Sequence, residues 1–193
     1  MRLEGIIAVI AWAALAWQFR LNWLETGDAA AAAWDMARYF TVLTNLLVAI
    51  VFTRAALTRR KPSAGLSAAV TIYIAVVGGV YHGLLARNLP VSDPEFWSDH
   101  GFHTLVPILV VIWWIAKAPK ARLAWSRALA WIAYPLGYLV YAMARGMADG
   151  VYPYFFIDLP RQGFAMTALW VAALSGLFLC LGLVAIGAGR ALR

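Results

Sequence analysis

Charged residues and cysteines are scarce in this chain of 193 residues. Lys, Arg, Asp and Glu make up 13% of it, against about 25% in soluble domains, and 64% of the residues are hydrophobic. Cys180 is the only cysteine, which excludes an internal disulfide, and its apolar surroundings favour a simple packing role. The sequence also lacks a Gly-x-Ser-x-Gly motif, an internal repeat and β-barrel alternation. These absences favour a helical membrane protein and exclude the common serine hydrolase motif.

The hydrophobic residues form long uninterrupted runs, each near the ~20 residues that span a bilayer core. The runs predict helices at about 3–19, 36–57, 65–87, 97–116, 124–145 and 163–189. We therefore expect an all-α polytopic membrane protein, a six-transmembrane-helix bundle forming one domain over residues 1–193. The first run carries Glu4 at its start and lacks a clear cleavage site, so we interpret it as a retained helix rather than a signal peptide. Residues 29–33 are all alanine and predict an extension of the second helix or a short loop helix.

Positive charge is distributed unevenly between the two ends of this predicted bundle. Eleven of the sixteen Lys and Arg residues fall on the side that carries both termini. Because an excess of Lys and Arg marks the cytoplasmic side, both termini are expected in the cytoplasm. The net charge of +7 then describes a basic rim suited to anionic membrane lipids. Without a basic domain or binding motif, we expect no nucleic-acid partner.

Polar side chains collect at the opposite, outer end of the predicted helices. The second helix would carry them in its first turns, the third in its last turns and the fourth in its first turns. These residues are Thr41, Thr44, Asn45, His82, Asp99, His100, His103 and Thr104, and the loop after the fifth helix adds Asp149, Tyr152 and Asp158. Ionisable groups at membrane depth are costly, so each is a functional hypothesis.

The spacing of these residues predicts a hydroxyl facing an imidazole. Residues three and four apart share a helix face. His100, His103 and Thr104 would therefore share one face of the fourth helix, and Thr41, Thr44 and Asn45 would share one face of the second. If the faces meet, an imidazole can take the proton of a threonine that attacks an ester. Asn45 or backbone N–H groups would stabilise the oxyanion. Asp99, Asp149 or Asp158 would orient the imidazole, and no spacing selects among them.

Structural roles are open for the same residues. A threonine in a membrane helix often bonds a carbonyl one turn back, and Asn45 can simply bridge two helices. His82 and His100 suit structural or supporting roles. Pro107 and Pro135 suit helix kinks.

Other classes of function also remain open. His82 and His103 lie at comparable depth and could bracket a haem. Asp99, His100 and His103 could hold a metal ion, although the set lacks a further ligand of certain geometry. A transporter or lipid-binding scaffold would have a polar vestibule here, but a broken helix pair is not evident. Our expectation is a protein without cofactor or metal.

Three segments of the chain resemble the androgen-induced family of multipass membrane proteins. The segment His100-Gly101-Phe102-His103-Thr104 is similar to the His-Gly-Met-His-Thr segment of that family. Residues 39–46, Tyr-Phe-Thr-Val-Leu-Thr-Asn-Leu, resemble its threonine segment, and residues 151–154, Val-Tyr-Pro-Tyr, resemble its Val-Tyr-Pro-aromatic segment. The resemblance implies a threonine hydrolase of fatty acid esters of hydroxy fatty acids. It assigns the nucleophile to Thr41 and the catalytic histidine to His103.

The chain also departs from the family pattern. The family tends to carry Asp or Asn three residues after its threonine, whereas this chain has Thr44 there and Asn45 next, so Thr44 is a rival nucleophile. Pro107 lies one residue nearer its histidine than in vertebrate members. The resemblance implies a shorter, bacterial-type member in the cytoplasmic membrane, acting on an amphiphilic lipid ester. The supporting residues are then Thr44, Asn45, His82, Asp99, His100, Thr104, Tyr152 and Asp158.

Overall fold

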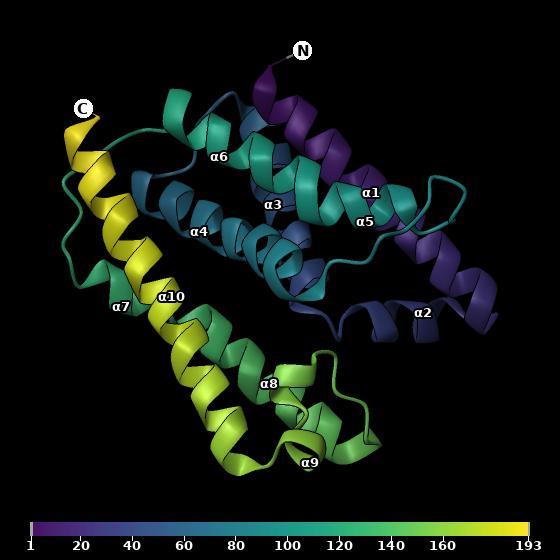
Figure 1. The fold of residues 1–193 in the computed structure, drawn as a ribbon. Coiled ribbons are helices and arrows are strands. Elements are labelled where there is room, and N and C mark those ends of the chain that lie inside the picture. Colours follow the sequence, from purple (N-terminus) through teal and green to yellow (C-terminus); the bar gives the residue numbers. More distant parts are fainter. Residues whose placement is uncertain (1, 193) are drawn as a thin grey trace. The chain divides into compact units, whose positions relative to one another are not determined.

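The computed structural model describes residues 2–192, and every regular element in that range is a helix (Figure 1). The prediction of an all-α protein is therefore confirmed. The chain divides into two compact units, Met1–Ala121 and Arg122–Arg193. The single domain expected from the sequence stays a prediction.

The first unit is built around four long helical segments, two of which contain a short turn of different pitch. Its elements are α1 (Leu3–Thr26), α2 (Ala29–Met36), α3 (Phe40–Thr58), α4 (Ala64–Val80), η1 (Tyr81–Leu85), α5 (Phe96–His100), η2 (Gly101–Leu105) and α6 (Val106–Ala116). Helix α1 packs along α3, and α4 packs against both α3 and α6. The outer polar segments of the sequence, in α3, η1 and η2, thus belong to one packed unit.

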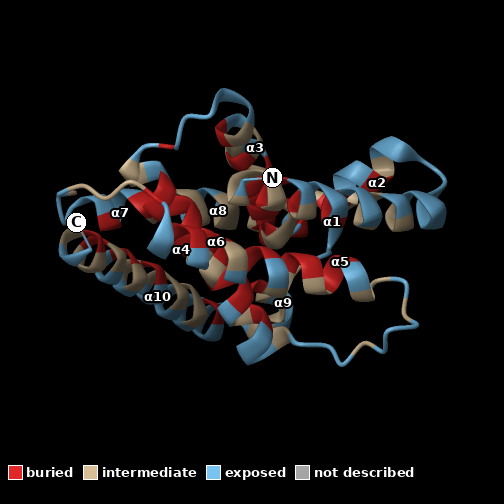
Figure 2. Cartoon of the chain, turned by 90° about the horizontal axis from the view of Figure 1, so that it is seen from above, coloured by how far each residue is buried: buried red, intermediate tan, exposed pale blue. Residues whose placement is uncertain are grey.

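Helix α4 is the most buried long helix of this unit. Of its most apolar window, 67% is buried, against 17% for the last helix of the chain, and Figure 2 shows the same contrast in colour. The core also contains Trp113 of α6, whose ring meets Phe52 of α3 edge-on at 4.8 Å between centroids. Burial of aromatic and branched side chains contributes most of the packing energy of such a unit.

Within residues 2–192, five helical segments are long and apolar enough to cross a membrane. They are Leu3–Thr26, Phe40–Thr58, Ala64–Leu85, Phe96–Ala116 and Phe164–Ala191. The helix expected at 124–145 is interrupted, since α7 (Arg127–Trp131) ends one residue before α8 (Ala133–Asp149) begins. Pro135 lacks the N–H that would bond the Trp131 carbonyl, which accounts for a break at this point. The sixth membrane span stays a prediction.

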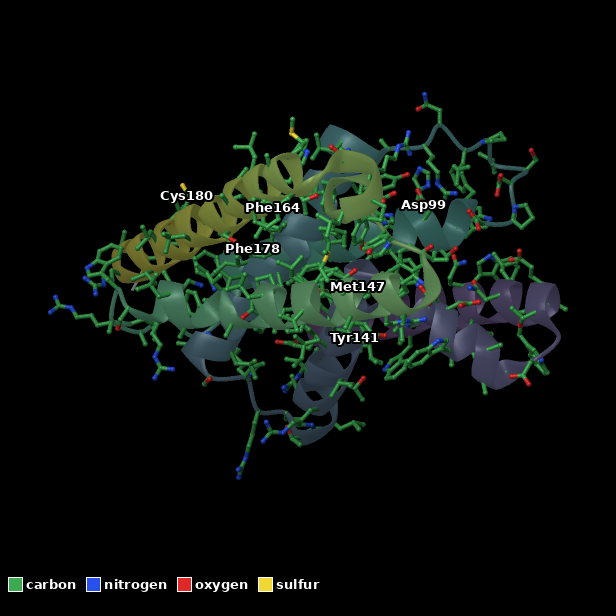
Figure 3. All side chains as sticks on the ribbon, turned by 90° about the horizontal axis from the view of Figure 1, so that it is seen from below. Asp99, Tyr141, Met147, Phe164, Phe178 and Cys180 are labelled. Carbon is green, nitrogen blue, oxygen red and sulfur yellow. The ribbon has the colours of Figure 1, made fainter. Side chains whose placement is uncertain are left out.

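The second unit consists of α7, α8, η3 (Phe155–Ile157), α9 (Leu159–Gln162) and α10 (Phe164–Ala191). Helix α10 packs closely on α7 at Gly182. A methyl group added to Gly182 would lie only 3.0 Å from Cβ of Ala128. The rest of α10 presents a largely exposed apolar surface, as a lipid-facing helix would. Cys180 is exposed on this surface (Figure 3), so it is not the core packing residue that its sequence context favours.

Two helix boundaries near the N-terminus differ from those expected. Helix α1 continues to Thr26 rather than residue 19, because its polar residues find partners: Gln18 donates to Asn22 and accepts from Ser98. Gly27 ends it in the left-handed conformation at φ 70°. Residues 29–36 form a separate helix, α2, capped by the Asp28 side chain, and α3 begins only at Phe40. The alanine run is thus a short loop helix.

Candidate active site

Two turns of π-helix carry the polar residues of the fourth and third expected helices. Element η1 includes Tyr81 and His82, and η2 includes His103 and Thr104. A π turn has i→i+5 hydrogen bonds and inserts an extra residue into a helix, and such turns are frequent at functional sites. The N–H of Val106 accordingly bonds the carbonyl of Gly101, five residues earlier.

Pro107 explains why the π turn lies here. Proline has no N–H, so it cannot bond the carbonyl of His103 four residues earlier, and its ring would crowd that carbonyl in an α-helix. The π register relieves the crowding, and Gly78 of α4 provides space on the other side. A methyl on Gly78 would lie 3.0 Å from the His103 carbonyl oxygen and 3.1 Å from Cβ of Pro107. Proline and glycine together therefore fix where the His103 backbone lies.

The hydrogen bonds of His103 determine which ring nitrogen is free to act as a base. Its Nδ1 lies 2.9 Å from the backbone carbonyl of Asp99 and 3.4 Å from Oδ1 of the same residue. Both partners are acceptors, so Nδ1 carries a hydrogen, and the neutral ring has its lone pair on Nε2. With 14% of its side chain exposed, His103 also keeps limited access.

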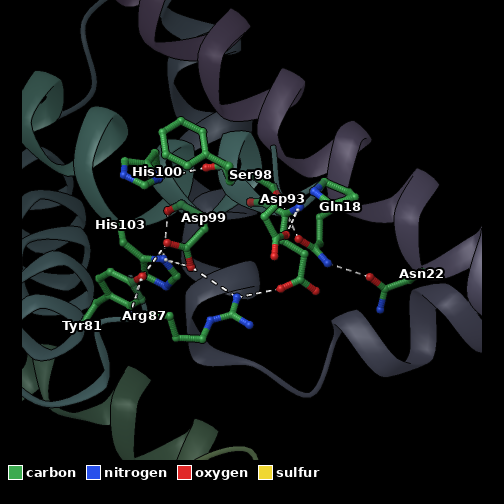
Figure 4. Close-up of polar contacts among 12 residues, drawn as sticks. Gln18, Asn22, Tyr81, Arg87, Asp93, Ser98, Asp99, His100 and His103 are labelled. Carbon is green, nitrogen blue, oxygen red and sulfur yellow. Dashed lines mark hydrogen bonds and ion pairs between the residues drawn. The ribbon is translucent and has the colours of Figure 1, made fainter. Parts of the chain in front are cut away.

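Asp99 is the carboxylate that the structure pairs with His103 (Figure 4). It is 5% exposed, and its Oδ2 accepts a hydrogen bond from the hydroxyl of Tyr81 at 2.5 Å. Its Oδ1 also lies 3.5 Å from Nη2 of Arg87, which forms a 2.8 Å ion pair with Glu95. A buried carboxylate is tolerated when it is paired and hydrogen-bonded in this way.

Arg87 lies beyond the end of η1 and compensates two carboxylates. Partial burial lowers its pKa, but the hydrogen bond to Glu95 and the charges of Glu95 and Asp99 outweigh this and raise the pKa above its usual value. The guanidinium is charged at physiological pH and so offers a positive charge to both carboxylates.

Asn45 joins the first turns of α3 to the histidine segment. Its Nδ2 donates to the carbonyl of Thr41 at 2.9 Å and to the carbonyl of Phe102 at 3.4 Å. The two oxygens share one nitrogen, so they cannot be farther apart than the sum of these distances. Thr41 and Phe102, the residue before His103, are thus neighbours through their backbones. The bridging role of Asn45 weighed from the sequence is confirmed.

The Asn45 amide donates to two carbonyls in this structure, so it would have to release one of them to stabilise an oxyanion, and that role stays a prediction. Its Oδ1 is buried and has no hydrogen-bond partner within the described part of the chain. An unpartnered buried carbonyl costs about 1–3 kcal/mol, so a bound water or a ligand hydroxyl would stabilise this position.

The two threonines of this segment differ in burial. Thr44 is completely buried, whereas Thr41 in the first turn of α3 keeps intermediate exposure. A nucleophile must be reached by its substrate, so the difference favours Thr41. Neither assignment is tested directly by the geometry, and both stay predictions.

His82 and Thr104 make direct contact, with Nε2 3.0 Å from Oγ1. This pair joins η1 to η2 at the surface, since His82 is exposed. A haem ligated through Nε2 of His82 would require this bond to break.

His100 has partners of its own. Its Nδ1 bonds the carbonyl of Phe96 at 2.9 Å, and its ring stacks on the Phe96 ring at 4.0 Å. His103 instead stacks on Tyr81, so the two histidines have different surroundings despite their three-residue spacing. Among residues 2–192 no group of three or more His, Cys, Asp and Glu side chains could hold a metal ion, and Asp99, His100 and His103 do not form one.

Tyr152 and Asp158 have roles within the second unit. The Tyr152 ring covers Gly146, where an added methyl would lie 2.4 Å from Cε1, and Asp158 caps α9 by accepting from the N–H of Arg161. Asp149 similarly accepts from the N–H of Val151. Their part in the site stays a prediction.

Sequence reasoning missed Tyr81, Arg87 and Glu95. Tyr81 is one hydrophobic aromatic residue among many, and its contact with Asp99 spans 18 residues and two helices. The available signal was the charge pattern, since Arg87 and Glu95 bracket the short loop between the two histidine-bearing helices.

Comparison with protein-family models, curated proteins and solved structures gives no match to this chain. The resemblance to the androgen-induced family therefore stays a prediction from three short segments.

Proposed function

We propose that this chain is an intramembrane lipid ester hydrolase in which Thr41 is the nucleophile and His103 the general base. The observation that supports it best is the Asn45 amide, which bonds the carbonyls of Thr41 and Phe102 at once. The hydrogen on Nδ1 of His103 supports it further, because Nε2 is then the basic nitrogen that a Thr–His pair needs.

In the proposed reaction the hydroxyl oxygen of Thr41 attacks the ester carbonyl carbon, and its proton passes to Nε2 of His103. The tetrahedral intermediate then expels the alcohol, which takes the proton back from Nε2. Asp99, beside Nδ1, stabilises the imidazolium that exists between these steps.

Water completes the cycle. It attacks the acyl-threonine carbonyl while Nε2 of His103 accepts its proton, and the proton returns to the oxygen of Thr41 as the carboxylic acid leaves. An outer-interface position suits this step, because water must reach the intermediate. The exposed ion pair of Arg87 and Glu95 supports this position.

The proposed setting is a six-span bundle in a bacterial cytoplasmic membrane with both termini inside. The basic residues near the termini support this orientation. The substrate is then an amphiphilic ester that enters from the outer leaflet, such as a fatty acid ester of a hydroxy fatty acid. A non-enzymatic lipid-binding, transport or haem protein is the alternative.

The test is hydrolysis of fatty-acyl esters by the purified protein in detergent micelles. Thr41→Ala and His103→Ala should each lower kcat by about 100-fold or more, the usual contribution of a nucleophile or base. Thr58→Ala is the matched control, because Thr58 ends the same helix and its hydroxyl bonds only nearby backbone groups, the carbonyl of Arg54 and the N–H of Arg60. Wild-type rates in the first two variants would contradict the proposal.

The contact between His82 and Thr104 favours a second candidate pair. In the tautomer with a hydrogen on Nδ1, Nε2 of His82 would accept the Thr104 proton over the observed 3.0 Å. If Thr104→Val and His82→Gln abolish hydrolysis while Thr41→Ala does not, this pair is the catalytic one.

A further inference from the structure

Tyr81 makes two contacts that converge on the same imidazole. It is buried, with 6% of its surface exposed, at the first position of η1. Its ring lies parallel to the His103 ring, with 3.8 Å between centroids and 10° between planes. Its hydroxyl donates to Oδ2 of Asp99, the residue whose Oδ1 lies 3.4 Å from Nδ1 of His103.

These contacts form a closed circuit of three side chains. The tyrosine ring covers one face of the imidazole and limits its tilt. The carboxylate held by the tyrosine hydroxyl lies at the imidazole edge and limits rotation within the plane. A base must be oriented toward the proton it accepts, and small misplacements cost much of the rate.

The tyrosine hydroxyl also connects this circuit to the segment that follows η1. It accepts a hydrogen bond from the backbone N–H of Arg87 at 3.2 Å. The Arg87 side chain then returns to Asp99 and to Glu95. The Tyr81 hydroxyl therefore donates one hydrogen bond, to Asp99, and accepts one, from the N–H of Arg87.

We propose that Tyr81 is the positioning residue of His103: its ring sets the imidazole plane and its hydroxyl keeps the Asp99 carboxylate beside Nδ1. Tyr81 acts through His103 and Asp99, because its hydroxyl is already bonded to Asp99 and to the N–H of Arg87. The proposal rests on the proposed function for the role of His103 as base.

Histidine NMR tests the positioning without reference to activity. The chain has only three histidines, so isotope-labelled histidine in micelles gives three imidazole systems, and His103→Gln identifies one. Tyr81→Leu should move the carbon-bound ring protons of His103 to lower field, because the stacked ring is lost, whereas Tyr81→Phe should leave them near their wild-type positions.

Phe96→Leu is the matched control, since Phe96 stacks on His100. It should move the His100 signals and leave those of His103 in place. His103 signals that are the same in Tyr81→Leu as in wild type would overturn the proposal.

Kinetics test the hydroxyl. Tyr81→Phe should lower kcat about tenfold, part of the 10²–10⁴-fold that a well-placed base contributes, with KM within about twofold because no substrate contact is lost. Tyr81→Phe should have no additional effect in an Asp99→Asn background, since the hydroxyl acts through that carboxylate. The comparison of Tyr81→Phe in the two backgrounds still tests the proposal if Tyr81→Leu fails to fold.

The outcomes separate this proposal from the proposed function. If the wild type is active, two results overturn the positioning role. One is a kcat that Tyr81→Phe leaves unchanged, and the other is a kcat that Tyr81→Phe lowers by the same factor in the wild-type and Asp99→Asn backgrounds. If the wild type hydrolyses no ester, the proposed function fails, and the imidazole signals alone decide whether Tyr81 positions His103.

Discussion

Gly78 of α4 lies directly against the carbonyl oxygen of His103, at a distance that a methyl group could share only if the histidine turn shifted. An added Cβ would be 3.0 Å from that oxygen and within 3.3 Å of two carbons of Pro107. The position of the histidine turn thus depends on a residue without a side chain on the neighbouring helix.

Gly78→Ala should therefore displace η2 and lower hydrolysis. We expect a loss of about 1–3 kcal/mol in stability from overpacking and a fall in kcat of about tenfold or more. Gly79→Ala is the control, because nothing lies within 4 Å of its added methyl. Thermal unfolding and kinetics of both variants check this, and equal behaviour of the two would contradict it.

Gly101 has the same role against α1. A methyl there would lie 2.8 Å from Cβ of Ala14, so Gly101→Ala should destabilise the protein and lower its activity. Adding Ala14→Gly removes the clashing group and should recover activity. The double variant should still be about 1 kcal/mol less stable than wild type, because glycine is unfavourable in a helix. A double variant as inactive as Gly101→Ala would show that the close approach is not the cause.

Pro107→Ala should separate stability from activity. The new N–H can bond the His103 carbonyl, so the π turn should revert to α-helix and turn His103 away from Asp99. An interior proline costs a helix about 3 kcal/mol, so the unfolding temperature should not fall, while kcat should drop about 100-fold. Full activity in this variant would show that the π register is not required.

Asn45→Leu tests the bridge between α3 and η2. It keeps the approximate volume but removes both hydrogen bonds to the carbonyls of Thr41 and Phe102. We expect kcat to fall at least tenfold, because the register between Thr41 and His103 is lost. Stability should change little, since the buried Oδ1 without a partner is removed as well. Unchanged kcat would contradict the role of this bridge.

Much of the helical pattern could be predicted from the sequence, because apolar runs of membrane length leave few alternatives. The runs at 65–87 and 97–116 agree closely with the segments Ala64–Leu85 and Phe96–Ala116. The break at Ile132 and the π turn η2 could not be placed, because they depend on where Pro135 and Pro107 force the backbone to change register. The extension of α1 depends on partners for Gln18 that lie 80 residues away.

The candidate site was predicted in part. The spacing grouped His100 with His103, the resemblance singled out His103, and Asp99 was one of three acids considered as its partner. The structure pairs Asp99 with His103 within the first unit. Tyr81 escaped notice because stacking on an imidazole is a tertiary contact with no local pattern. Asn45 was given both a bridging and an oxyanion role, and the structure shows the bridge, which depends on a contact with Phe102 that lies 57 residues away.

Covalent labelling tests the central claim most directly. The purified protein is treated in micelles with a fluorophosphonate, which modifies activated hydroxyl nucleophiles, and the modified residue is identified by peptide mass spectrometry. We predict one adduct, on Thr41, and its absence from the folded His103→Ala variant. An adduct on Thr44 or Thr104, or none on an intact protein, would contradict the account.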